Sequence, residues 1–91
     1  MDDFRGALGQ RVKDLRERLG LAQEQLAERA DLHVTYVSGI ERGRRNPGLN
    51  ILAGLAKALR TSLPALVADL RPNVKVKVQK RGRPPKRGRR S

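Results

Sequence analysis

The sequence predicts an all-α protein with about five helices, followed by a basic C-terminal tail. Apolar side chains recur at intervals of three and four residues through most of residues 4–69, which places them on one face of each helix. Residues that cap or stop helices separate these segments. The apolar side chains are almost all aliphatic, because aromatic residues make up only 2% of the chain. We therefore expect a helical domain over residues 1–70 and a tail over residues 71–91.

The first helix is expected over residues 4–19, with an apolar face formed by Phe4, Leu8, Val12, Leu15 and Leu19. Asp2 or Asp3 can cap its start, and Gly20 is a stop signal. A second helix over residues 23–30 and a third over residues 34–42 follow closely, and Gly43 ends the third.

Residues 43–48 are dense in turn-forming residues and predict a loop. A fourth helix is expected over residues 50–59 and a last one over residues 63–69, with Ser62 as its cap and Pro64 in its first turn. Residues 74–78 alternate valine and lysine, which predicts a linker or an arm that pairs across a dimer. Residues 79–91 have no apolar side chain and are expected to be disordered without a partner.

Composition argues against several classes of protein. The chain has no cysteine and a single histidine, so a thiolate or histidine metal site is not expected. No carboxylate pair is placed as a catalytic pair would be, and we expect neither an enzyme nor a cofactor. No apolar segment approaches the length of a membrane span. The acidic N-terminus is unlike a signal peptide, which predicts a cytoplasmic protein.

Charge is distributed very unevenly along the chain. The formal net charge is +12, and residues 71–91 contribute ten of the 21 basic residues but none of the nine acidic ones. A nearly neutral domain with a dense cationic tail indicates a polyanionic partner. Nucleic acid is favoured because the tail is rich in arginine, whose planar guanidinium matches phosphates and base edges.

Two segments carry a resemblance to a known family. Residues 19–27 (LGLAQEQLA) and residues 35–47 (TYVSGIERGRRNP) resemble the helix-turn-helix of phage-repressor-like (Cro/repressor, XRE-type) proteins, and residues 56–59 match the family's fourth helix. The resemblance covers about residues 5–70 and implies a lambda-repressor-like arrangement of the five helices. It implies a second helix, a turn and a third helix that enters the major groove of double-stranded DNA.

The resemblance also implies roles for individual residues. Base edges would be met by the outward face of the third helix, at Val34, Thr35, Ser38 and Gly39. The DNA backbone would be met by Gln23, Tyr36, His33, Arg42, Arg44, Arg45 and Asn46. The alternatives are a cap or a surface residue for His33, a simple surface side chain for Gln23, and a ring packed on the flank of the domain for Tyr36. Arg16 and Glu41 are expected to form a partly buried ion pair that orients two helices.

Three residues depart from the family's pattern. Ala22 stands where serine or threonine usually caps the second helix, at a cost of about 1 kcal/mol. Asp31 replaces the usual turn glycine, and aspartate tolerates a left-handed backbone better than most residues. Gly39 offers no side chain for reading bases, so the third helix lacks a bidentate contact such as arginine to guanine. Direct readout by this helix alone is expected to be modest.

The tail contains a second motif. Arg81, Gly82, Arg83 and Pro84 resemble the core of an AT-hook, which lies extended in the narrow minor groove of A·T-rich DNA. The alternative is a generic phosphate-binding arm.

The favoured function is therefore a sequence-specific transcriptional regulator that binds double-stranded DNA as a homodimer, without a small-molecule effector. The domain also resembles the small controller regulators of restriction–modification systems. The alternatives are a nucleoid-associated architectural protein, or an antitoxin-type interaction module. Recognition of RNA is less favoured because the chain has few aromatic side chains for base stacking.

Overall fold

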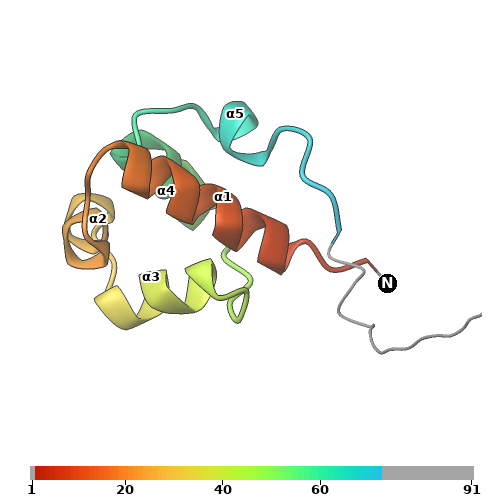
Figure 1. The fold of residues 1–91 in the computed structure, drawn as a ribbon, viewed down its shortest axis with the longest axis horizontal. Helices are drawn as coiled ribbons and strands as arrows, with labels where there is room; N and C mark the ends of the chain where they lie inside the picture. Colours follow the sequence, from red (N-terminus) through yellow and green to blue (C-terminus); the bar gives the residue numbers. More distant parts are fainter. Residues whose placement is uncertain (1, 73–91) are drawn as a thin grey trace, which may run out of the picture.

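The five expected helices are present in the computed structural model, which describes residues 2–72. They are α1 (Arg5–Arg18), α2 (Gln23–Ala30), α3 (Val34–Glu41), α4 (Leu49–Ala58) and α5 (Leu63–Val67), and the described range contains no strand (Figure 1). α1 packs on α3, α2 packs on α3 and α4, and α5 lies against α4 and α1. The predicted all-α class is confirmed. The expectations for residues 74–78 and for the motif at residues 81–84 fall outside the described residues.

One aliphatic cluster holds the five helices together. Every helix contributes to it, with Leu8, Val12, Leu26, Ala27, Val37, Ile40, Leu55, Ala56, Ala58, Leu59 and Leu66 all buried. The predicted apolar face of α1 is too long, because Phe4 and Leu19 at its two ends remain largely exposed. Burying this aliphatic surface is the main favourable contribution to folding. None of the helices in residues 2–72 is long and apolar enough to cross a membrane.

The ends of four helices share one backbone arrangement. Gly20, Asp31, Gly43 and Arg60 each have a positive φ, between 57° and 74°. The residue after each one donates its N–H back to a carbonyl in the last turn of the helix, as in a Schellman motif. The stop signals Gly20 and Gly43 are thus confirmed, and Asp31 has the left-handed conformation expected of it.

Several predicted helix boundaries were wrong by one or two residues. α1 starts at Arg5, because Phe4 is its N-cap residue; Asp3 accepts a hydrogen bond from the Arg5 N–H. α3 ends at Glu41 rather than Arg42, since the Schellman turn at Gly43 takes its last carbonyls. α4 runs from Leu49 to Ala58 rather than from residue 50 to residue 59.

α5 stops at Val67, two residues earlier than predicted, and a side chain from α1 accounts for its end. Ala68 has an extended backbone, with φ −63° and ψ 132°. The guanidinium of Arg11 donates to the carbonyls of Ala65, Leu66 and Ala68 at 3.2, 3.1 and 2.9 Å. A cation at the C-terminus of a helix donates hydrogen bonds to its unpaired carbonyls and interacts favourably with the negative end of the helix dipole. At the other end, Ser62 caps α5 as predicted, by accepting from the Ala65 N–H.

α1 and α3 approach so closely that their contact depends on a glycine. A Cβ atom placed on Gly9 would lie 2.7 Å from the carbonyl oxygen of Glu41, and it would also meet the carbonyl of Ile40. Both contacts are with backbone at the end of α3, which cannot move aside as a flexible side chain can. Gly54 of α4 provides a contrast, because a Cβ there would meet no atom within 4 Å.

We predict that the same substitution has opposite effects at these two glycines. Gly9→Ala should lower the free energy of unfolding by about 1–3 kcal/mol, because the added methyl group overpacks the contact between α1 and α3. Gly54→Ala should raise it by about 1 kcal/mol, through its greater helix propensity alone. Urea unfolding followed by circular dichroism measures both. A shift of both variants in the same direction would contradict the close approach at Gly9.

Candidate nucleic-acid interface

α2, a short turn and α3 form the unit that positions the candidate interface. Asp31 ends α2 in a left-handed conformation, and His33 is the N-cap residue of α3. The His33 Nδ1 accepts from the Thr35 N–H at 3.2 Å and lies 2.8 Å from the Thr35 hydroxyl. His33 therefore has the capping role that was one of its expected roles. With Nδ1 acting as an acceptor, the neutral ring has its proton on Nε2.

The four positions expected on the outward face of α3 differ in their exposure. Thr35 is exposed and Ser38 is half-buried. Val34 is also half-buried and packs in part against the aliphatic core. Gly39 is buried rather than exposed, and a Cβ on it would lie 2.8 Å from the Cγ of Arg45. A side chain from the following loop therefore covers this position.

A buried ion pair fixes α3 relative to α1. The Arg16 Nε lies 2.7 Å from Glu41 Oε2, and its Nη2 lies 3.0 Å from Oε1, a bidentate contact. The Arg16 and Glu41 side chains retain only 11% and 3% of their exposure. Arg16 Nη1 also donates to the carbonyl of Leu21 at 2.7 Å. This is the pair that the sequence predicts, and the hydrogen bonds to Glu41 raise the pKa of Arg16 against the effect of desolvation.

Gln23 belongs to the same network. Its Nε2 donates to Glu41 Oε1 at 2.9 Å, so this side chain has a structural role whatever else it contacts. The residue before it, Ala22, provides no side-chain cap for α2. Gln25 accepts from the Ala22 N–H at 2.8 Å, which satisfies the cap residue but leaves the first-turn N–H groups of α2 without a side-chain acceptor. Such N–H groups are suited to bind an anion.

The loop after α3 is strongly cationic. Arg42, Arg44, Arg45 and Asn46 are all exposed. The nearest acid along the chain, Glu41, is neutralised by Arg16, so it does not offset these charges. The guanidinium carbon of Arg45 lies 5.5 Å from the centroid of the Tyr36 ring, within range of a cation–π contact. Tyr36 itself is half-buried and packs partly on the core.

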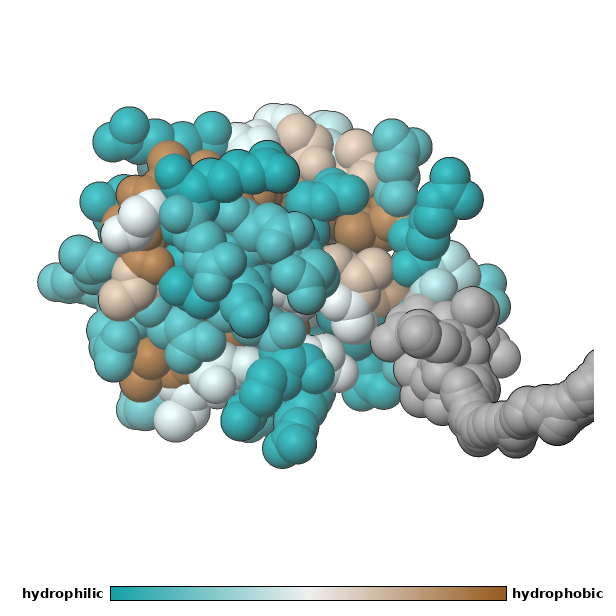
Figure 2. Space-filling model, viewed as in Figure 1, coloured by the Kyte–Doolittle hydropathy of each residue, from teal (hydrophilic) through white to brown (hydrophobic). Residues whose placement is uncertain are grey.

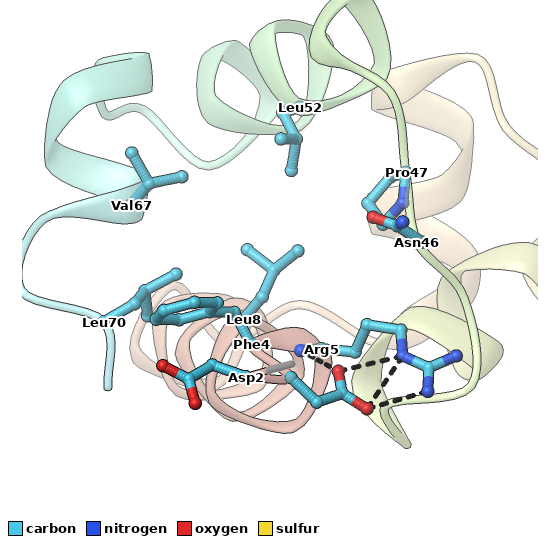
Figure 3. Close-up of a pocket in the computed structure, with 10 residues that line it drawn as sticks. Asp2, Phe4, Arg5, Leu8, Asn46, Pro47, Leu52, Val67 and Leu70 are labelled. Atoms are coloured by element: carbon cyan, nitrogen blue, oxygen red, sulfur yellow. Dashed lines mark hydrogen bonds and ion pairs between the residues drawn. The ribbon is translucent and has the colours of Figure 1, made fainter. Parts of the chain in front are cut away.

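A separate apolar groove borders the basic loop. It has a volume of about 500 Å³, and Figure 3 shows Leu8, Leu52, Val67 and Leu70 directed into it. Asn46 and Pro47 line its far side, and the ion pair between Asp3 and Arg5 lies at its edge. Figure 2 shows apolar surface between α5 and the start of α1, and further apolar patches at the opposite end of the same face.

Two side-chain contacts of this structure could not be found from the sequence. One is the path of Arg45 over Gly39, for which the missing side chain at Gly39 is the only signal. The other is the attachment of Arg11 to α5, because its carbonyl partners lie more than 50 residues away along the chain. Within residues 2–72, no group of three acidic or histidine side chains could hold a metal ion.

Comparison with known proteins agrees with this geometry. A family model described as helix-turn-helix matches residues 12–66, which is more than half of the chain. The chain belongs to the helix-turn-helix family. Its match includes α2, α3 and α4 completely, and it extends through the predicted Cro/repressor-like segments. The expected family is thereby confirmed.

Individual relatives fall into two kinds. The control protein C.SmaI of Serratia marcescens is 46% identical over 65 residues, covering 71% of this chain and 77% of that protein. The immunity repressor protein of Bacillus phage phi105 is 44% identical over 62 residues, or 68% of this chain and 43% of the repressor. Among solved structures, the restriction-modification controller protein C.AhdI of Aeromonas hydrophila has a TM-score of 0.66 and 43% identity, and covers 67% of this chain and 92% of its own.

These matches show the general function. The chain is a DNA-binding transcriptional regulator of the helix-turn-helix family, and α3 occupies the position of the recognition helix.

We predict that Glu41→Ala lowers the free energy of unfolding by about 3–5 kcal/mol. The substitution leaves the Arg16 guanidinium buried without its counter-charge, and it removes the acceptor of Gln23. Thermal or urea unfolding measures the loss. Asp3→Ala is the matched control, because it breaks an ion pair whose partners are both about half exposed and should change stability far less than Glu41→Ala. An equal, small effect of the two substitutions would rule out a structural role for the Arg16–Glu41 pair.

Proposed function

We propose that the protein acts as a homodimer that binds paired half-sites in double-stranded DNA and regulates transcription by binding alone, without catalysis. One observation carries the proposal: α3 presents Thr35 and Ser38 next to a row of exposed arginines. Its only acid, Glu41, is buried in an ion pair with Arg16. A helix without free negative charge, flanked by cations, suits the major groove and its phosphate edges.

The contacts with phosphate are assigned to the residues around α3. Arg42, Arg44 and Asn46 are exposed on the loop that leaves the helix. Tyr36 and Gln23 are half-buried, which holds their polar ends in fixed positions, and the second amide hydrogen of Gln23 stays available next to the uncapped start of α2. The exposed His33 Nε2–H is a further donor at the N-terminus of α3. These contacts would set the register of the protein on DNA.

A second copy of the chain is the proposed protein partner. Leu49 of α4 is 68% exposed and Val67 of α5 is 38% exposed, although both are large and apolar. A two-fold contact through α4 and α5 would cover such side chains and place two copies of α3 on successive turns of the duplex. In this proposal the protein needs neither a cofactor nor a small-molecule effector, and it acts in the cytoplasm, on the nucleoid.

The division at residue 70 into a DNA-binding domain and a tail is part of this proposal. The ten cationic side chains of residues 71–91 would bind phosphates, and Arg81, Gly82, Arg83 and Pro84 would lie in the A·T-rich minor groove. The tail would then supply much of the affinity.

A second candidate function follows from the short side chains of α3. Thr35 and Ser38 can each make single hydrogen bonds, which discriminate weakly between base pairs. An architectural protein that binds broadly to A·T-rich DNA needs no more than this.

Selection of bound fragments from a random duplex library is expected to enrich a palindrome, with half-sites about one helical turn apart. The palindrome is expected because a two-fold dimer presents two identical recognition helices. Sequencing of the bound fraction at physiological salt measures the enrichment. Diffuse A·T-rich enrichment would instead support the architectural candidate, and no enrichment would leave the interaction module.

Truncation after residue 70 is expected to flatten the salt dependence of binding. If about six of the tail's cationic side chains meet phosphates, the slope of log K against log[salt] should fall by about five units. Fluorescence anisotropy between 50 and 200 mM salt measures the slope. Replacing A·T tracts beside the site by G·C tracts should weaken the full chain but not the truncated one if the minor-groove assignment holds. An unchanged slope would refute any role of the tail in phosphate binding.

A further inference from the structure

Arg45 follows a different path from the other arginines of its loop. The sequence assigns it to the DNA backbone together with Arg42 and Arg44. In the structure its stem crosses α3 at Gly39, where Cγ and Nε would lie 2.8 and 3.2 Å from a Cβ on that residue. The Arg45 side chain thus fills the space that an ordinary residue at position 39 would occupy.

The backbone directs Arg45 onto the helix. Gly43 has a φ of 74°, and the Arg44 N–H donates to the Gly39 carbonyl at 2.8 Å. This Schellman turn reverses the chain, so the residue after Arg44 lies beside the last turns of α3 instead of continuing away from it. A glycine at each of the two positions therefore makes the arrangement possible, one for the turn and one for the crossing.

Tyr36 supports the far end of the Arg45 side chain. The guanidinium carbon lies 5.5 Å from the ring centroid, and the ring is held in place by its packing on the core. In the part of the chain that the structure describes, the Arg45 guanidinium donates no hydrogen bond to another residue. Its planar set of N–H donors is positioned but not used.

The location of this guanidinium decides its target. Thr35, Ser38 and Gly39 are spaced three and four residues apart and share one stripe of α3. If α3 enters the major groove as proposed above, whatever lies on this stripe faces the bases, whereas phosphates line the edges of the groove. We infer that Arg45 reads a guanine through paired hydrogen bonds to O6 and N7, and that it supplies the bidentate contact that α3 itself lacks.

Substitution of Arg45 separates reading from charge. Arg45→Lys retains the positive charge but loses the planar fork. We expect it to relax the preference for guanine at one position in each half-site by about 5- to 150-fold, with a smaller effect on binding to non-specific DNA. Arg44→Ala is the matched control, because it should weaken binding to all sequences about equally and leave the motif unchanged.

Gly39→Ala tests the same inference without touching the arginine. The added methyl group would displace the Arg45 stem from α3, while alanine favours the helix and should leave unfolding stability equal or higher. We expect a folded protein whose guanine preference is relaxed as in Arg45→Lys. Unfolding curves recorded on the same preparations show that the loss of preference is not a loss of fold.

The experiment is duplex selection and sequencing with the full chain and these three variants. Loss of one guanine position in both Arg45→Lys and Gly39→Ala, but not in Arg44→Ala, supports the inference. A motif that stays intact in Arg45→Lys while affinity falls for every sequence would overturn it and make Arg45 a phosphate contact, with the proposed regulator still standing. Absence of any motif for the unmodified chain would overturn the inference and the proposed function together.

Discussion

The buried contact between Arg16 and Glu41 is the constraint on which the rest of the structure depends. It joins α1 to the end of α3, and through the Leu21 carbonyl and the Gln23 amide it also holds the start of α2. All three helices therefore meet at one charged group. A buried ion pair tolerates little displacement, since each charge loses its compensation when the geometry opens. The pair thereby fixes the orientation of α3, the recognition helix, relative to α1.

The same contact has a consequence for binding. Glu41 is the only acid of α3, and a free carboxylate there would repel DNA phosphates. Its side chain is almost completely buried against Arg16, so the loop arginines that follow it act without opposition. The stability of the domain and the charge of its interface are set by a single interaction.

Close backbone packing complements the ion pair. Gly9 lets α1 rest directly on the last carbonyls of α3, and the left-handed residue after α3 turns the chain back over that helix. The loop can then place a longer side chain, that of Arg45, on the face of a short helix whose own side chains are small. α3 is eight residues long, and Thr35 and Ser38 are small, so the reach of Arg45 extends what the helix can contact.

Much of this architecture could be predicted from local sequence. Apolar spacing predicted the five helices, Gly20 and Gly43 predicted their ends, and Ser62 predicted a cap, because each of these depends on neighbouring residues only. The Arg16–Glu41 pair came from the resemblance to a family and not from spacing. The end of α5 was less predictable, because its last carbonyls accept hydrogen bonds from Arg11, a residue of α1.

Contacts between separate segments of the chain set which atoms cover which surface. The family resemblance assigns Gly39 to the outward face of α3, yet this residue is buried and Arg45 lies over it. The pattern of a helix describes that helix by itself, without the segments that fold back onto it. Local sequence patterns predicted the helices and their order, and the family resemblance identified the recognition helix. The side chains that this helix offers to a partner were determined by a contact between residues six apart, which depends on a turn, an aromatic ring and the absence of a Cβ atom.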